Sequence, residues 1–148
     1  MAQGFLLYYM AVSENNAAEQ SFALDYLHNL VKQQKNLLDE YYLDFWPTPL
    51  AAYYLGDVTF AAVMETVNRP PRMVSPLTTP ASLELARRKE LCVALFHDGV
   101  KSRAEGNEVH CLARMRECYG LENPVIVQEW YLARYEVSKA DSAARATA

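Results

Sequence analysis

The chain has 148 residues, the length of a single domain, and its 51% apolar and 22% charged residues exclude a disordered protein. The net charge of −4 is unevenly placed, because residues 1–58 carry two Lys against seven Asp or Glu. This acidity argues against a nucleic-acid partner and favours a basic protein partner.

The first predicted helix covers residues 4–12. This segment is too short to span a bilayer, and no Lys or Arg precedes it as in a secretory signal. The three cysteines form an odd set without close spacing, which indicates reduced thiols. We therefore expect a soluble, cytoplasmic protein with no membrane partner.

A second helix is predicted to begin at Asn16, because Asn16 and Glu19 have the spacing of a capping box. It either continues through Leu38 or breaks near Asn36. Its predicted apolar stripe has helical spacing and consists of Phe22, Tyr26, Leu27, Leu30 and Val31.

The next predicted helix is short, with Thr48 as its cap, Pro49 at its first position and Gly56 as its end. Asp57 is expected to cap the helix after it, which carries Phe60, Val63, Met64 and Val67. A proline-rich connection at about 68–80 then interrupts the helical pattern.

Three helices are predicted in the remainder of the chain. Thr79-Pro80 opens a helix that extends to about residue 103, Asn107 opens one that Gly120 ends, and Asn123-Pro124 opens the last. The last helix is expected to carry Ile126, Trp130, Leu132, Ala133 and Tyr135, and residues 138–148 form a flexible tail. Since no segment alternates like a strand, the predicted fold class is all-α with about seven helices.

Small and large side chains alternate in a regular way over residues 91–120. Small residues recur at Ala94, Gly99, Cys111 and Cys118, and large apolar ones at Leu91, Leu95, Phe96, Leu112 and Met115. Small residues let a second helix come close, which is typical of a packed helix pair.

This pattern resembles a degenerate tetratricopeptide repeat (TPR) of bacterial type. Gly99, Cys111 and Cys118 match its small positions, Gly106 its turn and Met115 its large position, while Pro124 lies one place beyond the expected Pro. Similarity also extends to Trp46-Pro-Thr-Pro-Leu50, Tyr54-Leu-Gly-Asp57 and Trp130-Tyr-Leu-Ala-Arg134, so it covers about half of the chain. The resemblance implies antiparallel helix pairs stacked in a right-handed array, a single domain over 1–137 and a concave protein-binding face.

The sequence predicts no catalytic or metal site and no cofactor. His110 and Cys111 are adjacent, so on a helix they point about 100° apart, and Cys92 and His97 lie five residues apart, a poor spacing for joint action. No phosphate-binding loop, nucleophile elbow or zinc motif is present. A small enzyme using a Cys/His pair, with His97 or His110, stays an alternative.

Three tyrosine pairs, Tyr8-Tyr9, Tyr41-Tyr42 and Tyr53-Tyr54, are the better functional candidates. Helical neighbours point in different directions, so one of each pair is expected in the core and the other at a surface; stacking of all of them between helices is the alternative. Arg88 is expected to pair with Glu84 on a solvated face. The predicted partner-binding residues are Asp39, Glu40, Tyr41, Tyr42, Asp44, Tyr53, Arg88 and Trp130.

These features together predict a non-catalytic protein-binding module. A stoichiometric inhibitor, such as a bacterial immunity protein that covers the basic active-site surface of a toxin, is one version, and a chaperone or adaptor is another. A structural homo-oligomer is the remaining alternative.

Overall fold

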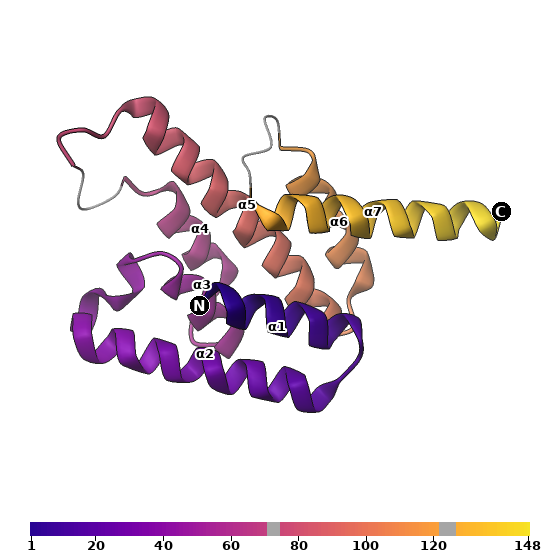
Figure 1. Cartoon of the computed structure of the whole chain (residues 1–148), viewed down its shortest axis with the longest axis horizontal. Coiled ribbons are helices and arrows are strands. Elements are labelled where there is room, and N and C mark those ends of the chain that lie inside the picture. The colour runs from indigo at the N-terminus through magenta and orange to yellow at the C-terminus, as the bar shows by residue number, and fades with distance from the viewer. Residues whose placement is uncertain (71–74, 122–126) are drawn as a thin grey trace. The chain divides into compact units, whose positions relative to one another are not determined.

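The computed structural model describes residues 1–70, 75–121 and 127–148. Over these ranges it contains seven α-helices, one 3-10 helix and no strand, which confirms the all-α prediction (Figure 1). The chain forms two compact units, unit 1 from Met1 to Thr78 and unit 2 from Thr79 to Ala148. The boundary lies inside the predicted connection at about 68–80, and the domain predicted over 1–137 spans both units. None of the helices in the described ranges is long and apolar enough to cross a bilayer.

Unit 1 is organised around its second helix, which packs against the first helix, the 3-10 helix and the third helix; the third helix also contacts the fourth. The elements are α1 (Ala2–Ser13), α2 (Ala17–Leu38), the 3-10 helix η1 (Asp39–Asp44), α3 (Thr48–Leu55) and α4 (Phe60–Asn68).

The core of unit 1 contains aromatic rings from α1 and α3. Tyr54 stacks on Phe5 at 5.7 Å between ring centroids and meets the edge of Tyr8 at 4.9 Å. Both Tyr8 and Tyr9 are buried, so this pair follows the alternative in which both rings pack between helices, and neither ring faces outward.

The buried face of α2 consists of Ala23, Leu27 and Val31, which recur every four residues. Phe22, which the predicted stripe included, is instead 64% exposed. It precedes Ala23 by one position and therefore points about 100° away from the packed face. A Cβ on Gly4 of α1 would lie 2.8 Å from Leu27 Cδ2, so glycine at that position permits close packing.

The helix ends of unit 1 mostly follow the predicted capping. Asn16 accepts a hydrogen bond from the Glu19 backbone N–H, and Gly56 ends α3 with a φ of 83°. The predicted cap Asp57 is wrong, because Thr59 accepts from the N–H three residues ahead and α4 starts at Phe60. The cap predicted at Thr48 is displaced too: Thr48 is the first residue of α3 and Pro47 occupies the cap position.

Unit 2 contains α5 (Pro80–Ala104), α6 (Glu108–Tyr119) and α7 (Gln128–Ala146), and each of these helices contacts the other two. Thr79 and Ser82 form a reciprocal capping box at the start of α5, and the Asn107 side chain accepts from the His110 N–H at the start of α6. Gly120 follows the last residue of α6, as predicted.

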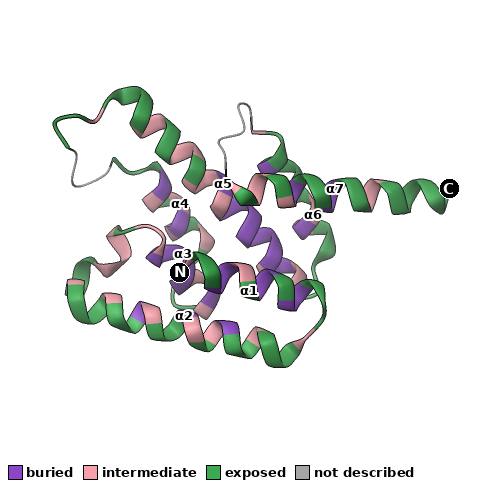
Figure 2. Cartoon of the chain, viewed as in Figure 1, coloured by how far each residue is buried: buried purple, intermediate pink, exposed green. Residues whose placement is uncertain are grey.

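Buried residues of unit 2 are concentrated in the second half of α5 and on the faces of α6 and α7 (Figure 2). The predicted small residues Ala94, Gly99, Cys111 and Cys118 are all buried. A Cβ on Gly99 would lie 3.1 Å from the Cys111 backbone oxygen, so α6 lies very close to α5 at this position.

The last helix differs from its prediction at both ends. Asn123, Pro124 and Ile126 lie outside the described residues, and the described helix begins at Gln128. The tail expected to fray from residue 138 instead continues α7 to Ala146. Alanine favours helix, and Arg116 of α6 pairs with Asp141 at 2.9 Å. Tyr135, predicted in the apolar stripe, is 59% exposed, while Ala133, Glu136 and Val137 are buried.

Candidate functional site

Exposed apolar residues and exposed carboxylates lie close together in sequence where α2 passes into η1. Leu37 is 77% exposed, Tyr41 47% and Phe45 38%. Asp39 and Glu40 are exposed beside them. We call these five residues the acidic aromatic surface. The aromatic rings of such a surface offer contact area at low entropic cost, and its carboxylates attract cations.

The backbone at Asp39 shapes this surface. Asp39 has a φ of +49°, an uncommon conformation for a residue other than glycine. Its N–H still bonds to the Lys35 carbonyl and so completes the last turn of α2. The positive φ ends α2 and sends the chain into η1, and it therefore sets the direction of Glu40 and Tyr41.

Two other predicted residues hold the segment in place. Asp44 pairs with Arg69 at the end of α4, with an N–O distance of 2.8 Å, and its side chain is only 15% exposed. The Nζ of Lys35 lies 5.6 Å from the ring centroid of Tyr42, a cation–π contact. Phe45 accepts a backbone hydrogen bond from Thr48 at the start of α3. The surface is thus anchored to α2, α3 and α4.

The remaining predicted residues lie elsewhere. Tyr53 of α3 packs against Phe60 with 5.5 Å between ring centroids and is half-buried, whereas its neighbour Tyr54 is buried. Arg88 of α5 forms the predicted ion pair with Glu84 at 2.9 Å. Hydrogen bonds from Arg87 and then Arg88 lower the pKa of Glu84 to about 2.

Trp130 lies in the first turn of α7 between two tyrosines. Its ring centroid is 5.3 Å from that of Tyr119 and 5.1 Å from that of Tyr131. Its Nε1 is buried without a hydrogen-bond partner in the described part of the chain. Trp130 and Arg88 belong to unit 2, whereas the other six predicted partner residues belong to unit 1.

Sequence reasoning missed Leu37 and Phe45. A usable signal existed for Leu37, which lies six residues after the buried Val31 and therefore about 240° around α2 from the packed face. Phe45 has no such signal, because its exposure depends on how η1 packs against α2 and α3.

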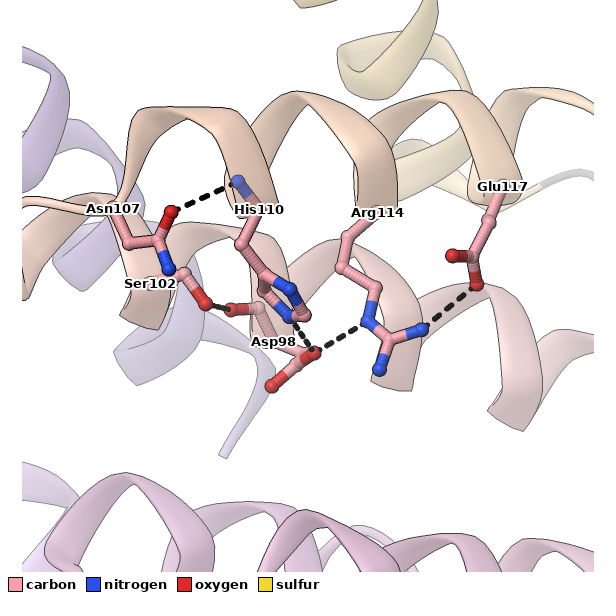
Figure 3. A network of polar contacts seen from close by, with 6 residues as sticks. All are labelled: Asp98, Ser102, Asn107, His110, Arg114 and Glu117. Carbon is pink, nitrogen blue, oxygen red and sulfur yellow. Dashed lines mark hydrogen bonds and ion pairs between the residues drawn. The ribbon is translucent and has the colours of Figure 1, made fainter.

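In unit 2, a polar network joins α5 to α6 around the buried carboxylate of Asp98 (Figure 3). Arg114 donates from Nε to Asp98 Oδ2 at 2.6 Å, and His110 Nε2 lies 3.0 Å from the same oxygen. Ser102 donates to the Asp98 backbone carbonyl, and Arg114 also pairs with the exposed Glu117. This arrangement neutralises a buried charge and links two helices.

A second ion-pair cluster joins all three helices of unit 2. Arg103 of α5 bonds to Glu108 of α6 at 2.8 Å and to the buried Glu136 of α7 at 3.0 Å. The bond to Glu108 and then the bond to Glu136 raise the pKa of Arg103 against the effect of burial.

The buried histidine of α5 lies beside a carboxylate. His97 is fully buried, and its Nε2 is 3.5 Å from Glu129 Oε1. Burial lowers the pKa of His97, while Glu129 acts in the opposite direction.

The structure brings two thiols together that the sequence spacing did not pair: Cys92 Sγ of α5 lies 3.1 Å from Cys118 Sγ of α6. The hydrogen bond to Cys92 and burial raise the pKa of Cys118, and burial raises that of Cys111 to about 11. Reactive cysteines need a lowered pKa, so these environments favour neutral, packed thiols.

Within the ranges 1–70, 75–121 and 127–148, no group of three or more His, Cys, Asp or Glu side chains is placed to hold a metal ion. Comparisons of the chain with protein-family models, with curated proteins and with solved structures found no match.

Proposed function

We propose that this protein is a non-catalytic protein-binding module and that the acidic aromatic surface binds a basic protein partner. The observation that carries the proposal is the exposure of Leu37, Tyr41 and Phe45 beside Asp39 and Glu40. Buried aromatic anchors carry much of the energy of protein interfaces, and charges around them increase the association rate.

The contacts that fix this surface favour binding. Asp44–Arg69 and the Phe45–Thr48 hydrogen bond hold η1 against its neighbours before any partner arrives. A preorganised surface loses less conformational entropy on binding. The positive φ at Asp39 also supports a functional role, because uncommon backbone conformations cluster at binding sites.

The helix pairing of a TPR-like protein is part of the proposal. Near the loop between α5 and α6, Arg103 bonds to Glu108. Further along both helices, Asp98 pairs with His110 and Arg114. Farthest from the loop, Cys92 contacts Cys118. This order of contacts supports an antiparallel pair, the unit that such repeats stack.

The partner that suits this surface is a toxin or effector with a basic active-site region, which an immunity protein neutralises by covering it. A chaperone or adaptor would use the same surface differently. Raised thiol pKa values at Cys111 and Cys118 disfavour the Cys/His enzyme, and the ring of His110 is bound to Asp98.

Two matched variant pairs test the surface in a binding assay, once affinity capture and mass spectrometry have identified a partner. Tyr41→Ala should raise Kd at least about fivefold, since an anchor is worth more than ~1 kcal/mol. Tyr135→Ala, which removes a tyrosine of similar exposure from α7, should leave Kd unchanged.

The charges are tested by association rates. Asp39→Asn combined with Glu40→Gln should slow association at low salt and weaken its salt dependence. Asp25→Asn combined with Glu65→Gln removes the same charge from other exposed positions of unit 1 and should have a smaller effect. Wild-type kinetics in folded Tyr41 and Asp39/Glu40 variants would rule out this surface.

A dimer in solution without any partner would favour the homo-oligomer instead.

A further inference from the structure

The two thiols at the interface of α5 and α6 are close enough to form a bond with little movement. Cys92 Sγ and Cys118 Sγ are 3.1 Å apart, and a disulfide requires about 2.0 Å. Cys118 Sγ also lies 3.4 Å from the Cys92 backbone oxygen, so its side chain points at Cys92 rather than along its own helix. Both residues are almost completely buried, at 2% and 0% exposure.

We propose that Cys92 and Cys118 are an oxidation site, at which a hydroperoxide such as hydrogen peroxide forms an intramolecular disulfide between α5 and α6. This proposal is independent of the proposed binding function.

The reaction balances with one peroxide per pair. One thiol sulfur attacks hydrogen peroxide, the O–O bond breaks, the leaving oxygen takes up the thiol proton and departs as water, and the other oxygen remains on sulfur as a sulfenic acid. The second thiol sulfur then attacks the sulfenic sulfur, and its proton leaves with the hydroxyl group as a second water. The two sulfurs lose two electrons in total, and the peroxide gains them.

The contact between the thiols decides the product. A sulfenic acid formed on either sulfur has the other thiol within van der Waals distance, so ring closure is faster than further oxidation. A small oxidant fits this location better than a bulky disulfide, because both thiols are inside the packed helix interface. Burial and the raised pKa of Cys118 make the reaction slow, since the thiolate is the reactive form.

Cys111 provides an internal control. It is also fully buried, but it lies seven residues before Cys118 on α6, about 10 Å along the helix axis. The proposed reaction therefore consumes two of the three thiols and leaves Cys111 reduced.

Mass spectrometry of the purified, folded full chain tests the proposal. After exposure to hydrogen peroxide, the chain is denatured and its remaining thiols are alkylated with N-ethylmaleimide. We expect a monomer that carries one label instead of three, a linked peptide containing Cys92 and Cys118, and return to three labels after reduction with dithiothreitol. The disulfide-linked chain should also unfold at a higher temperature than the reduced chain, because the bond links residues 26 positions apart.

Three serine variants show which of the three cysteines form the disulfide. Cys111→Ser should form the link at a rate within about twofold of wild type, whereas Cys92→Ser and Cys118→Ser should lose it entirely. Because the wild-type peptide map identifies the bond by itself, a misfolded variant does not compromise the test. A link through Cys111, a link between two chains, or three reduced thiols at peroxide concentrations that oxidise exposed methionines would overturn the proposal.

Discussion

Gly99 shows how one residue sets a helix–helix distance. A Cβ at this position would approach a backbone oxygen of α6 and the Arg114 Cβ at 3.1 and 3.2 Å, tighter than ordinary contacts. A backbone oxygen in a packed helix cannot move away as a flexible side chain could. The sequence pattern predicted a small residue here, and the packing explains why.

Replacing Gly99 by Leu should lower the free energy of unfolding by ~1–3 kcal/mol through overpacking, although leucine is the better helix former. Ala104→Leu, at an exposed position on the same helix, should change it by less than ~0.5 kcal/mol. Urea unfolding followed by circular dichroism measures both. Equal stability of the two variants would show that α5 and α6 are not in close contact at Gly99.

His97 connects the stability of unit 2 to pH. Because burial lowers its folded-state pKa below the ordinary 6.5, the unfolded chain binds the proton more readily. The stabilising contribution is complete above about pH 6.5 and is lost as pH falls toward the lowered value, by up to ~1.4 kcal/mol per pH unit.

The urea midpoint of the wild type should therefore decrease as the pH is lowered from about 7 to about 5.5. Carboxylates ordinarily titrate below this pH range. His97→Gln should show a flatter profile over this range, whatever its absolute stability. Unfolding curves at several pH values give both slopes. Parallel profiles would mean that His97 does not control the effect.

At the scale of elements, Arg114 of α6 pairs with two carboxylates: the buried Asp98 of α5, which links the two helices, and the exposed Glu117 of α6. The side chain of Asp98 is 5% exposed and that of Glu117 is 51% exposed, and both accept from Arg114. Buried charged hydrogen bonds contribute far more than surface ion pairs, because solvent screens the latter.

Asp98→Asn keeps the shape of the side chain and should cost ~1–3 kcal/mol of unfolding free energy. Glu117→Gln is its matched control on the same partner and should cost less than ~0.5 kcal/mol. Denaturant unfolding at neutral pH compares them. The interpretation of Asp98 as the anchor of this network would not survive a result in which both variants lose the same stability.

At the scale of the whole molecule, charge and packing both divide at Thr78. Unit 1 carries four Lys or Arg against eight acidic residues, and unit 2 carries ten of each, so the net charge of −4 belongs to unit 1. The packing interactions described above lie within one unit or the other. A local defect should therefore remain in the unit in which it is made.

Hydrogen exchange measured by mass spectrometry tests this independence. Asp98→Asn should speed amide exchange in α5 and α6 and leave α1 to α4 unchanged, because local opening follows the cooperative unit that contains the defect. Asp44→Asn, which breaks the ion pair to Arg69, should show the reverse pattern. Faster exchange in both units from either variant would show that they unfold together.

The sequence by itself determined the all-α class and most helix ends. Asn16, Gly56, Thr79, Asn107 and Gly120 act at the predicted ends, because a cap depends on hydrogen bonds within a few residues. Two predicted caps are wrong: Asp57 lies two residues before the actual cap Thr59, and Thr48 lies one residue after the cap position, which Pro47 occupies. The small residues of α5 and α6 were likewise readable from their spacing.

Only the tertiary structure decided which side chains face each other and which face water. The packing of helices against one another decides the burial of both Tyr8 and Tyr9, the exposure of Phe45 and the contact between Cys92 and Cys118. Helical periodicity restricts a residue to one side of its own helix, but it does not specify the neighbour on that side. The acidic residues of the candidate surface were therefore predictable from the sequence, and the helical spacing from Val31 also indicated an outward position for Leu37. The exposure of Phe45, in contrast, depends on the packing of α2, η1 and α3.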